Sequence, residues 1–588
     1  MRKNVVKGVV TLAGTFVFAM AAFAATPTQN RSAKLVPMIG PSADAGADAV
    51  VERPIVLAKS GALTKVQGQL QVAAQAWRQS PDVQGARMQS GLPAGLFSGD
   101  KVLVEIYYRQ TSANRGSLRN ASDSVRHALQ GLGAKSTRTL GNAAVVAWVP
   151  LASLAALAAD PNIARVMPAR RVRHLTGSVT SEGVAASNAD WWRTAGSFDG
   201  AGVKIGHIDS FDDSGTSAPN NPTIASLQAS NDWPPNTQLT LYDFKDYSGA
   251  PGLCTTPGFG CEAVAHGDAT MELLYDFAPA ATFFAYDTYF TSDWYNAILD
   301  AANIDDGTTG TLGDILGPPK VNVISVSLGA PLDSIGDGTA IPGSIAEAAG
   351  FARANGVVIV NAAGNQNGGH WSGASNIATS GTNKNYHRWN GNQTYNSVAN
   401  GYCLPANFDL AFSLSWDDWQ ASGTQFAPTK DYALELYRQK TIGYVLEATS
   451  DFAQDGTPGE TPQEYIDFTT TSSAKGPNCP AGTSEYFLRI KRNTAGASNY
   501  FQVFDEVGYD LLQFETSPAS IGFPADSPNV ISVAAIDQTT PTTIEDFSSR
   551  GPTLGPGGTA PVTYNPISND PNPKPDLAQF DNVGTVAY

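Results

Sequence analysis

The sequence predicts an α/β protein whose main domain has a parallel central sheet, with an α+β module before it and an antiparallel β-sandwich inserted into it. Three observations lead to this fold class. From Val179 onward, apolar strands alternate with helical segments, which is typical of a parallel sheet covered by helices on both faces. Residues 101–174 show the order β-α-β-β-α-β. Residues 383–516 contain short alternating stretches separated by Gly, Pro, Asn and Asp, which is typical of an antiparallel sandwich.

The N-terminus is typical of a secretory signal peptide over residues 1–24. Arg2 and Lys3 precede an apolar stretch, and Ala22-Phe23-Ala24 supplies a small-residue cleavage site. The alternative is a buried first helix, which is disfavoured because the basic start and the small-residue end come in the order of a signal peptide. The apolar stretch is also too short to span a membrane. We therefore expect a secreted or periplasmic protein without a membrane span. Residues 25–100 are rich in Ala, Gly, Gln and Pro, and apart from a helix expected over 64–78 they are predicted to form a leader or spacer.

Composition limits the partners of the chain. Charged residues make up 15% of it and its formal net charge is −16, so nucleic acid and anionic membrane are disfavoured as partners. Its four cysteines allow several disulfide pairings. We favour the local pairs Cys254–Cys261 and Cys403–Cys479, since an exported protein can form disulfides. A metal site is disfavoured because no C-x-x-C or paired-His spacing is present.

Residues 101–174 are predicted to form one compact domain. The expected elements are strands over 101–109, near 135–140, over 144–149 and over 163–167, with helices over 120–132 and 151–159. In chain order they make the split-βαβ, or ferredoxin-like, arrangement. The basic run Arg170-Arg171-Val172-Arg173-His174 follows, and we expect it to be an exposed junction with the next domain.

The main domain is predicted to span residues 178–382 and 517–588, with the sandwich at 383–516 between them. Its expected strands lie at 203–208, 282–286, 321–327, 357–362 and 528–535, and its expected helices at 266–277, 292–303 and 344–355. Strands of the insert are expected at 408–416, 431–437, 465–471, 486–492 and 500–504. Active sites of open parallel sheets form at the carboxyl ends of strands. Asp209, Gly329 and Asn365 all lie at such ends.

Three polar residues fit parts of the machinery of peptide-bond hydrolysis. This reaction needs a nucleophile, a base, a group that orients the base, and donors for the oxyanion. Asp209 would orient an imidazole, His266 would be the general base, and Asn365 would donate its side-chain amide to the oxyanion. Each residue alone also has an ordinary structural explanation, as a turn Asp, a helix-cap His and a turn Asn. Together they favour catalysis.

Several motifs lie in the order found in one known family. Val203–Asp209 ends in the Asp, His266-Gly267 opens a helix, and Val357–Asn365 ends in the Asn. The other matching segments are Ile324–Gly329, Asp546–Pro552 and Lys574–Ala578. Taken together, they resemble the subtilisin-like serine peptidases (subtilases). The resemblance implies a subtilisin-like fold, an Asp209–His266–Ser triad, an oxyanion donor at Asn365, and binding of the substrate backbone along Ser327, Leu328 and Gly329.

The resemblance also implies partners and marks two departures. Protein or peptide substrates are implied, and residues 101–174 would be a propeptide that acts as intramolecular inhibitor and folding chaperone. The family usually has Gly where this chain has Phe211, and its usual His-Gly-Thr-His has Asp268 in place of Thr and Ala269 in place of the second His here. Both changes concern subfamily and local packing more than chemistry. Asp268 leads to the hypothesis that a nearby carboxylate raises the pKa of His266.

No nucleophilic serine can be assigned in this sequence. The family's serine lies in a Gly-Thr-Ser motif that opens a long helix beyond the segment matched by Lys574–Ala578. Gly215-Thr216-Ser217 has the right letters but runs into Asn220-Asn221-Pro222, where no apolar helix can begin. Gly482-Thr483-Ser484 leads into a strand. We therefore expect the sequence to be a truncated reading of a longer endopeptidase precursor, and to be inactive by itself.

Two alternatives to a peptidase remain open. The chain can be a catalytically inactive peptide-binding protein of the same fold, or the sandwich can bind a surface or a carbohydrate. The candidate aromatics for the last function are Trp416, Trp419 and Tyr437, although core packing is favoured for them. No cofactor is expected. Calcium is possible at the acidic loops Asp212-Asp213 and Asp305-Asp306, where solvated turns are favoured, and no site for it is placed.

Overall fold

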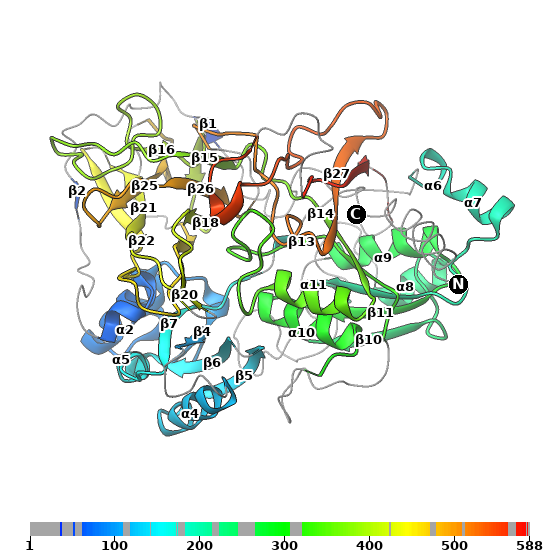
Figure 1. Cartoon of the computed structure of the whole chain (residues 1–588), viewed down its shortest axis with the longest axis horizontal. Coiled ribbons are helices and arrows are strands. Elements are labelled where there is room, and N and C mark those ends of the chain that lie inside the picture. The colour runs from blue at the N-terminus through cyan, green and yellow to red at the C-terminus, as the bar shows by residue number, and fades with distance from the viewer. Residues whose placement is uncertain are drawn as a thin grey trace.

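The structure of the protein is a computed structural model, shown in Figure 1. It describes residues 36–37, 51–52, 62–109, 118–141, 143–171, 173–174, 183–213, 223–244, 265–305, 320–400, 402–422, 425–440, 442–470, 478–507, 512–562, 572–581, 583 and 585. The predicted signal peptide, the pair Cys254–Cys261 and the motif Gly215-Thr216-Ser217 lie outside the described residues. In the part of the chain that the structure describes, no helix is long and apolar enough to cross a membrane.

A seven-stranded parallel sheet forms the centre of the main domain, with the strand order β10-β11-β9-β12-β14-β27-β28. The predicted parallel sheet is therefore confirmed. From β9 the chain passes to β10 and β11 on one side and then crosses to β12 on the other, so the strand order reverses between β9 and β12. The strands are β9 (Lys204–Asp209), β10 (Leu239–Asp243), β11 (Thr282–Asp287), β12 (Val323–Val326), β14 (Val358–Ala362), β27 (Val530–Asp537) and β28 (Leu577–Asp581).

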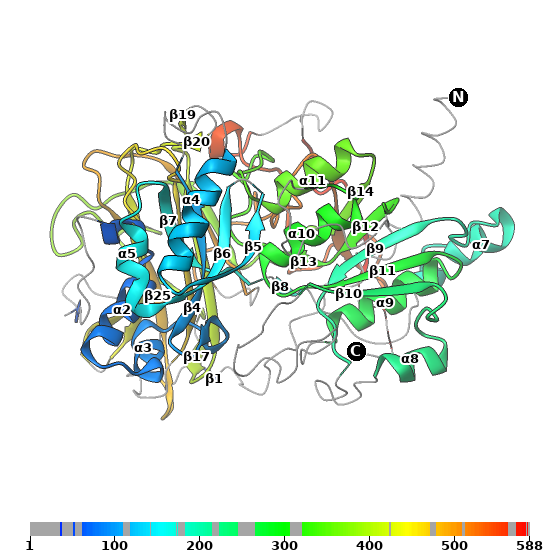
Figure 2. The same ribbon diagram turned by 90° about the horizontal axis from the view of Figure 1, so that it is seen from below.

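Helices cover both faces of this sheet. On one face, Leu274 of α9 (His266–Phe277) shares a buried cluster with Ile205 of β9. On the other face, Ile298 of α10 (Thr291–Ala301) shares a second cluster with Ile208. Helix α11 (Ile345–Ala354) packs beside α10, as Figure 2 shows. Alternate residues of β9 therefore face opposite layers, which explains why this strand is apolar along most of its length. Three short helices, α6 (Gly183–Ala186), α7 (Ala189–Gly196) and α8 (Ile224–Ser230), complete this part.

The N-terminal module is a separate antiparallel sheet with the strand order β5-β6-β4-β7, extended by β3. The first and third long strands of the module are its central pair, which is the split-βαβ arrangement. Helix α10 lies between β5 and the central sheet of the main domain (Figure 2). The elements are β3 (Phe97–Ser98), β4 (Lys101–Tyr108), α4 (Leu118–Gly131), β5 (Lys135–Leu140), β6 (Ala144–Pro150), η4 (Leu151–Ser153), α5 (Leu154–Ala158) and β7 (Ile163–Pro168).

Residues 62–100 differ from the expected leader or spacer, because they fold onto this module. Helix α2 (Gly68–Gln79) buries Leu70 and Ala73 in the same cluster as the strands of the module. It is followed by α3 (Val83–Ser90), with 3-10 turns η2 (Ala62–Lys65) and η3 (Ala94–Leu96) on either side. Two further short strands, β1 (Val36–Pro37) and β2 (Val51–Glu52), precede them.

The insert is a sandwich of two sheets, with orders β15-β26-β18-β23 and β16-β25-β21-β22-β2. Inward side chains of both sheets, such as Leu414 and Leu436, form one buried core. The first strand, β15, precedes the expected start at residue 383. The strands of the insert are β15 (His370–Ala374), β16 (Asn396–Ser397), β17 (Tyr402–Pro405), β18 (Asp409–Trp416), β19 (Ala421–Ser422), β20 (Gln425–Phe426), β21 (Tyr432–Gln439), β22 (Tyr444–Ser450), β23 (Gln463–Thr469), β24 (Thr483–Ser484), β25 (Tyr486–Arg492) and β26 (Tyr500–Asp505). Outside the two sandwich sheets, β17 and β24 form a small sheet with β1, and β19 pairs with β20.

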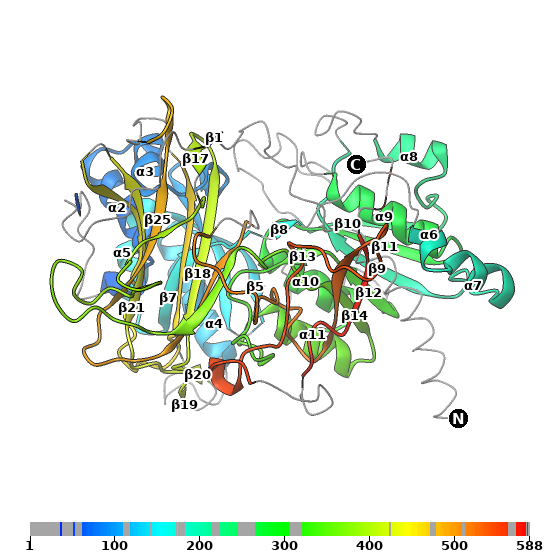
Figure 3. The ribbon, with the colours of Figure 1, turned by 90° about the horizontal axis from the view of Figure 1, so that it is seen from above.

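The predicted disulfide of the insert is present. Cys403 and Cys479 are bonded, and they join chain segments 76 residues apart. Figure 3 shows the sandwich strands at the same end of the molecule as α2 and α3, away from α9. The insert and the N-terminal residues thus lie on the same side of the main domain.

Candidate active site

Asp209 and His266 form a hydrogen-bonded pair beside the point where the strand order of the central sheet reverses. Asp209 is the last residue of β9 and His266 is the first residue of α9. His266 Nδ1 donates to Asp209 Oδ1 at 2.6 Å, and both side chains are buried. With Nδ1 as the donor, Nε2 is the nitrogen that can accept a proton. This is the geometry of a general base oriented by a carboxylate.

Gly267 allows α9 to begin directly against the end of β9. Its backbone N–H donates to Ser210 O at 2.7 Å. A Cβ at this position would lie 2.6 Å from the same oxygen and 2.8 Å from the ring of Phe211, closer than non-bonded atoms can approach. The glycine after His266 is therefore needed to bring the imidazole within reach of Asp209.

Phe211 takes part in packing. The side chain is fully buried and its ring makes edge contacts with His207 at 5.5 Å and with Trp233 at 6.0 Å between centroids. In this chain an aromatic core thus fills the space beside the carboxyl end of β9.

A second buried histidine, His207, is joined to Asp209 through Thr270, and the sequence analysis did not identify either residue. His207 Nδ1 lies 3.3 Å from Ser325 O, and Nε2 lies 2.6 Å from Thr270 Oγ1. A carbonyl oxygen only accepts, so Nδ1 carries the proton and Nε2 accepts from the Thr270 hydroxyl. Burial lowers the pKa of His207, which favours this neutral form.

The Thr270 hydroxyl also has other acceptors within reach, since its oxygen lies 3.1 Å from both His266 O and Gly267 O. Its oxygen also lies 3.2 Å from Asp209 Oδ2. A hydroxyl has one proton, and the shorter contact with the bare Nε2 of His207 favours donation there. The Asp209 carboxylate in turn accepts at Oδ1 from the Ser210 backbone N–H at 2.8 Å. The pair is thus set in a buried polar network rather than at a solvated strand end.

Asp268, which the sequence analysis named as a carboxylate near His266, is buried and accepts a backbone hydrogen bond. Its Oδ2 accepts from the Asp212 backbone N–H at 2.9 Å. Burial, followed by the nearby charges of Asp212, Asp287 and Glu272, raises the pKa of the Asp268 carboxyl well above its ordinary value. Burial thus disfavours the charged form of this carboxyl, which is the form that would stabilise a charged imidazole.

The expected substrate-binding strand is occupied by the chain's own backbone. Leu328 and Gly329 form β13, which pairs antiparallel with β8 (Arg173–His174), with Leu328 opposite His174 and Gly329 opposite Arg173. Ser327, immediately before β13, is buried, and its Oγ has no hydrogen-bond partner among the described residues. The segment after the N-terminal module thus lies along β13 as an added strand.

Arg170, at the start of the basic run, is buried and not exposed as expected. Its Nε lies 3.0 Å from Glu105 Oε2 and its Nη1 donates to Pro331 O at 2.7 Å. A buried guanidinium is tolerated here because a carboxylate and a carbonyl satisfy it. Arg170 therefore connects β4 of the module to the loop after β13.

Asn365 comes three residues after the end of a strand in the same sheet as Asp209. It follows β14 and is 4% exposed. Strands β9, β12 and β14 are neighbours in the sheet, and Asp209, Ser327 and Asn365 lie at or within three residues of their carboxyl ends. Gly364 has a φ of 112°, a conformation that favours glycine just before Asn365.

The two late sequence motifs hold this edge together. In the Asp546–Pro552 segment, the Ser549 hydroxyl accepts from Gln366 N at 3.0 Å and donates to Gln366 Oε1 at 3.1 Å, which ties down the residue after Asn365. In the Lys574–Ala578 segment, Lys574 Nζ lies 2.7 Å from Asp576 Oδ2, which also accepts from Ser532 N at 2.7 Å. Both motifs are thus explained by packing of the sheet.

The structure gives little support to the carbohydrate-binding and calcium-binding sites considered in the sequence analysis. Trp416 and Tyr437 are buried in the sandwich, so they cannot stack on a carbohydrate, and the favoured core packing is confirmed for them. Among the described residues, no group of three or more His, Cys, Asp or Glu side chains is placed to hold a metal ion. Asp213, one of the acidic-loop residues, accepts from Ile224 N at 2.9 Å.

Comparisons with known proteins give a distant likeness in structure. No protein-family model matches the chain, and no curated protein gives a significant match. A structure of the Clostridium perfringens CspB protease has 14% identity and a TM-score of 0.36, over 67% of this chain and 79% of that chain. The epidermin leader peptide processing serine protease (EpiP) from Staphylococcus aureus has 12% identity and a TM-score of 0.31, over 79% of this chain and 75% of that chain. At these values the likeness concerns the fold at most and carries nothing about the reaction.

Proposed function

We propose that the protein is the precursor of a secreted or periplasmic serine endopeptidase of the subtilisin-like type, which hydrolyses peptide bonds of proteins. The observation that supports this most is the buried hydrogen bond of 2.6 Å between His266 Nδ1 and Asp209 Oδ1 beside the reversal of strand order. In this proposal Asp209 orients the imidazole and stabilises its charged form. His266 Nε2 takes the proton from the attacking serine and later gives it to the leaving amine.

The proposal also assigns roles in substrate binding and oxyanion stabilisation to residues near the carboxyl ends of the central strands. Asn365 would donate its amide to the oxyanion, and Leu328 and Gly329 would bind the substrate backbone as an added strand. The chain's own Arg173–His174 segment has that place here. Residues 101–174 would therefore act as an inhibiting propeptide whose tail blocks the substrate strand.

A catalytically inactive peptide-binding protein is the second candidate function. The pairing of β8 with β13 is also compatible with it, because a strand that pairs with an extended segment could bind a peptide in the same way. The two candidates differ in whether His266 is needed for turnover, and the same experiment separates them.

The test is the hydrolysis of unfolded casein by purified protein. The assay uses the full-length protein, because the proposed mechanism needs an attacking serine besides Asp209 and His266. H266A is expected to lower kcat/KM by about 10⁶-fold and N365A by about 10²–10³-fold. H127A, which removes an exposed histidine of the N-terminal module, is the control and should leave activity unchanged. Activity that survives H266A would exclude the proposed mechanism, and a parent protein that binds casein without cleaving it would favour the inactive alternative.

A further inference from the structure

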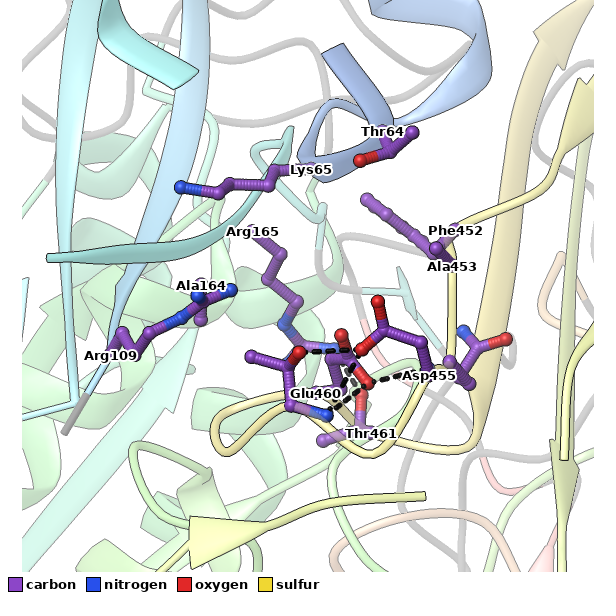
Figure 4. Close-up of a pocket in the computed structure, with 12 residues that line it drawn as sticks. Thr64, Lys65, Arg109, Ala164, Arg165, Phe452, Ala453, Asp455, Glu460 and Thr461 are labelled. Carbon is purple, nitrogen blue, oxygen red and sulfur yellow. Dashed lines mark hydrogen bonds between the residues drawn. The ribbon is translucent and has the colours of Figure 1, made fainter. Parts of the chain in front are cut away.

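A polar cavity of about 220 Å³ lies between the N-terminal module and the β-sandwich insert. Figure 4 shows Lys65 of η2, Arg109 just after β4 and Arg165 of β7 on one side of it. Asp455 and Glu460, from the loop between β22 and β23, line the other side. The candidate catalytic residues do not line this cavity, so it is separate from the candidate active site.

The hydrogen bonds that hold the cations of the cavity do not neutralise them. Lys65 Nζ donates to Asp160 O at 2.8 Å, and Arg165 Nη1 donates to the hydroxyl of Thr461. Both acceptors are uncharged. The Nε atoms of Arg109 and Arg165 are buried and have no hydrogen-bond partner among the described residues. Burial, and then the charge of Arg109, lowers the pKa of Lys65, so these two cations lie close enough to repel each other.

Arg165 is the cation that most needs an anionic partner. It is 8% exposed, and its guanidinium carbon lies 4.1 Å from the centre of the Tyr107 ring. The carboxylate of Glu105 acts on its charge but is bonded to Arg170 at 3.0 Å. A guanidinium stays protonated in proteins, so it cannot respond to burial by losing its proton. A buried charge of this kind is stabilised when an anion pairs with it.

The acidic side of the cavity is satisfied by its own loop. Asp455 Oδ1 accepts from Thr457 N at 3.2 Å and from Thr457 Oγ1 at 2.5 Å. The hydroxyl of Thr457 lowers the pKa of Asp455, which keeps this carboxyl ionised. Burial, and then the charge of Asp455, raises the pKa of Glu460 to about 8, so Glu460 is mostly neutral at pH 7. The cavity therefore combines three cations with a single ionised carboxylate at neutral pH.

Hydrogen phosphate matches both sides of such a cavity. Its ionised oxygens can accept from Arg109 and Arg165, and its remaining P–OH can donate to Asp455, because a carboxylate has about four lone-pair sites. Sulfate has no proton at neutral pH and would set a bare oxygen against this carboxylate. A phosphate monoester has lost most of its last proton at pH 7, since its second pKa is about 6. The cavity is also much larger than the volume of one water, about 30 Å³.

We propose that this cavity is a binding site for free phosphate, held by Lys65, Arg109 and Arg165 and selected over sulfate by Asp455. The site is independent of the proposed peptidase reaction. The free energy of binding would stabilise the folded chain, because the cavity is formed by residues far apart in the sequence and does not exist in the unfolded state.

The first experiment is isothermal titration calorimetry of the full-length protein with sodium phosphate at pH 7, in a buffer free of phosphate and sulfate. Saturable binding of one ion per chain is expected. R109A and R165Q should each weaken binding about 10-fold or more, since each removes a charge-assisted hydrogen bond. R353A is the matched control, because it removes an exposed arginine in the last turn of α11, and it should leave the affinity unchanged.

Two results of this titration would overturn the proposal. One is the absence of saturable binding at millimolar phosphate. The other is equal binding by the parent protein, R109A and R165Q, which would place the ion elsewhere on the chain. Because R109A changes a side chain that is only partly buried, it tests the site even if R165Q fails to fold.

The second experiment tests the selection by Asp455. Sulfate and glycerol 3-phosphate should bind the parent protein at least about 10-fold more weakly than phosphate does. D455N replaces the acceptor by an amide that can donate, so it should bind sulfate more tightly than the parent protein does. A misfolded variant would not gain affinity in this way. Equal affinity of the parent protein for sulfate and phosphate would exclude phosphate as the selected ligand. These readouts measure binding alone, so they hold whether or not the protein is a peptidase.

Discussion

Thr270 offers a direct test of the hydrogen-bond network behind the candidate active site. T270V removes the hydroxyl and keeps the shape of the side chain. His207 and Asp209 are both 0% exposed, so neither can replace the lost contact with bulk water. His207 Nε2 loses its 2.6 Å contact and Asp209 Oδ2 its 3.2 Å contact. Leaving one buried group unsatisfied costs about 1–3 kcal/mol, and we expect the free energy of unfolding to fall by that amount.

The assay combines urea unfolding with NMR of the histidine ring nitrogens. In the parent protein, the ¹⁵N shifts of His207 should show a proton on Nδ1 and none on Nε2, because Ser325 O can only accept. T194V is the matched control, since the hydroxyl of Thr194 donates to Asp190 O at 2.8 Å on an exposed helix, where water can replace the lost contact. Its effect should stay within about 0.5 kcal/mol.

Two results would refute this reasoning. If T270V is as stable as T194V, the hydroxyl does not satisfy a buried acceptor. If the proton of His207 is found on Nε2, the direction of the chain of hydrogen bonds is reversed, and Thr270 donates to Asp209 instead.

Three further predictions concern other parts of the chain. The loop of 76 residues closed by Cys403–Cys479 predicts that the double variant C403S/C479S loses about 4.5 kcal/mol of stability in urea unfolding; an unchanged midpoint would contradict this. D268N should leave the NMR titration of His266 unchanged, and a clear shift would restore the hypothesis that this carboxyl acts on the base. Burial, then the charge of Asp455, raises the pKa of Glu460 from 4.5 to about 8, so the folded state holds more protons than the unfolded state and stability falls as pH rises through that window. E460Q should therefore gain stability relative to the parent between about pH 5 and about pH 8, and parallel pH profiles would show that Glu460 titrates normally.

Local patterns were enough to place the pair at the centre of the candidate site. The apolar run that ends at Asp209 and the His-Gly before an apolar helix are signals within a few residues, and α9 has the bounds expected from them, His266–Phe277. The disulfide Cys403–Cys479 was also chosen correctly, since local pairing is the simplest option. The strand end and the helix start depend on short stretches of chain, which is why periodicity and spacing find them.

What the sequence could not show depends on contacts between distant segments. Gln67 bonds to a carbonyl 398 residues away, and no pattern within residues 25–100 reveals such a partner. The role of His207 was hidden for a different reason. It shares a face of β9 with Asp209, two residues on, and Thr270 lies one helical turn after His266. Both spacings were readable, but only the packing of α9 against β9 shows that the two residues meet.

The polarity of β8 connects the buried basic run with the proposed reaction. In the antiparallel register, Arg173 pairs with Gly329 and His174 with Leu328, so the chain runs along β13 toward Ser327 and the edge that carries Asp209. A substrate cut at this edge would need the residues before its scissile bond on β13, running in the same direction. Burial of Arg170 against Glu105 and Pro331 fixes where this run begins. Under the proposed function, the basic run would anchor a tail that lies where a product would lie. Its first two residues are not solvated, since Arg170 bonds to Glu105 of the N-terminal module and Pro331 of the main domain, and Arg171 pairs with Asp467 of the insert.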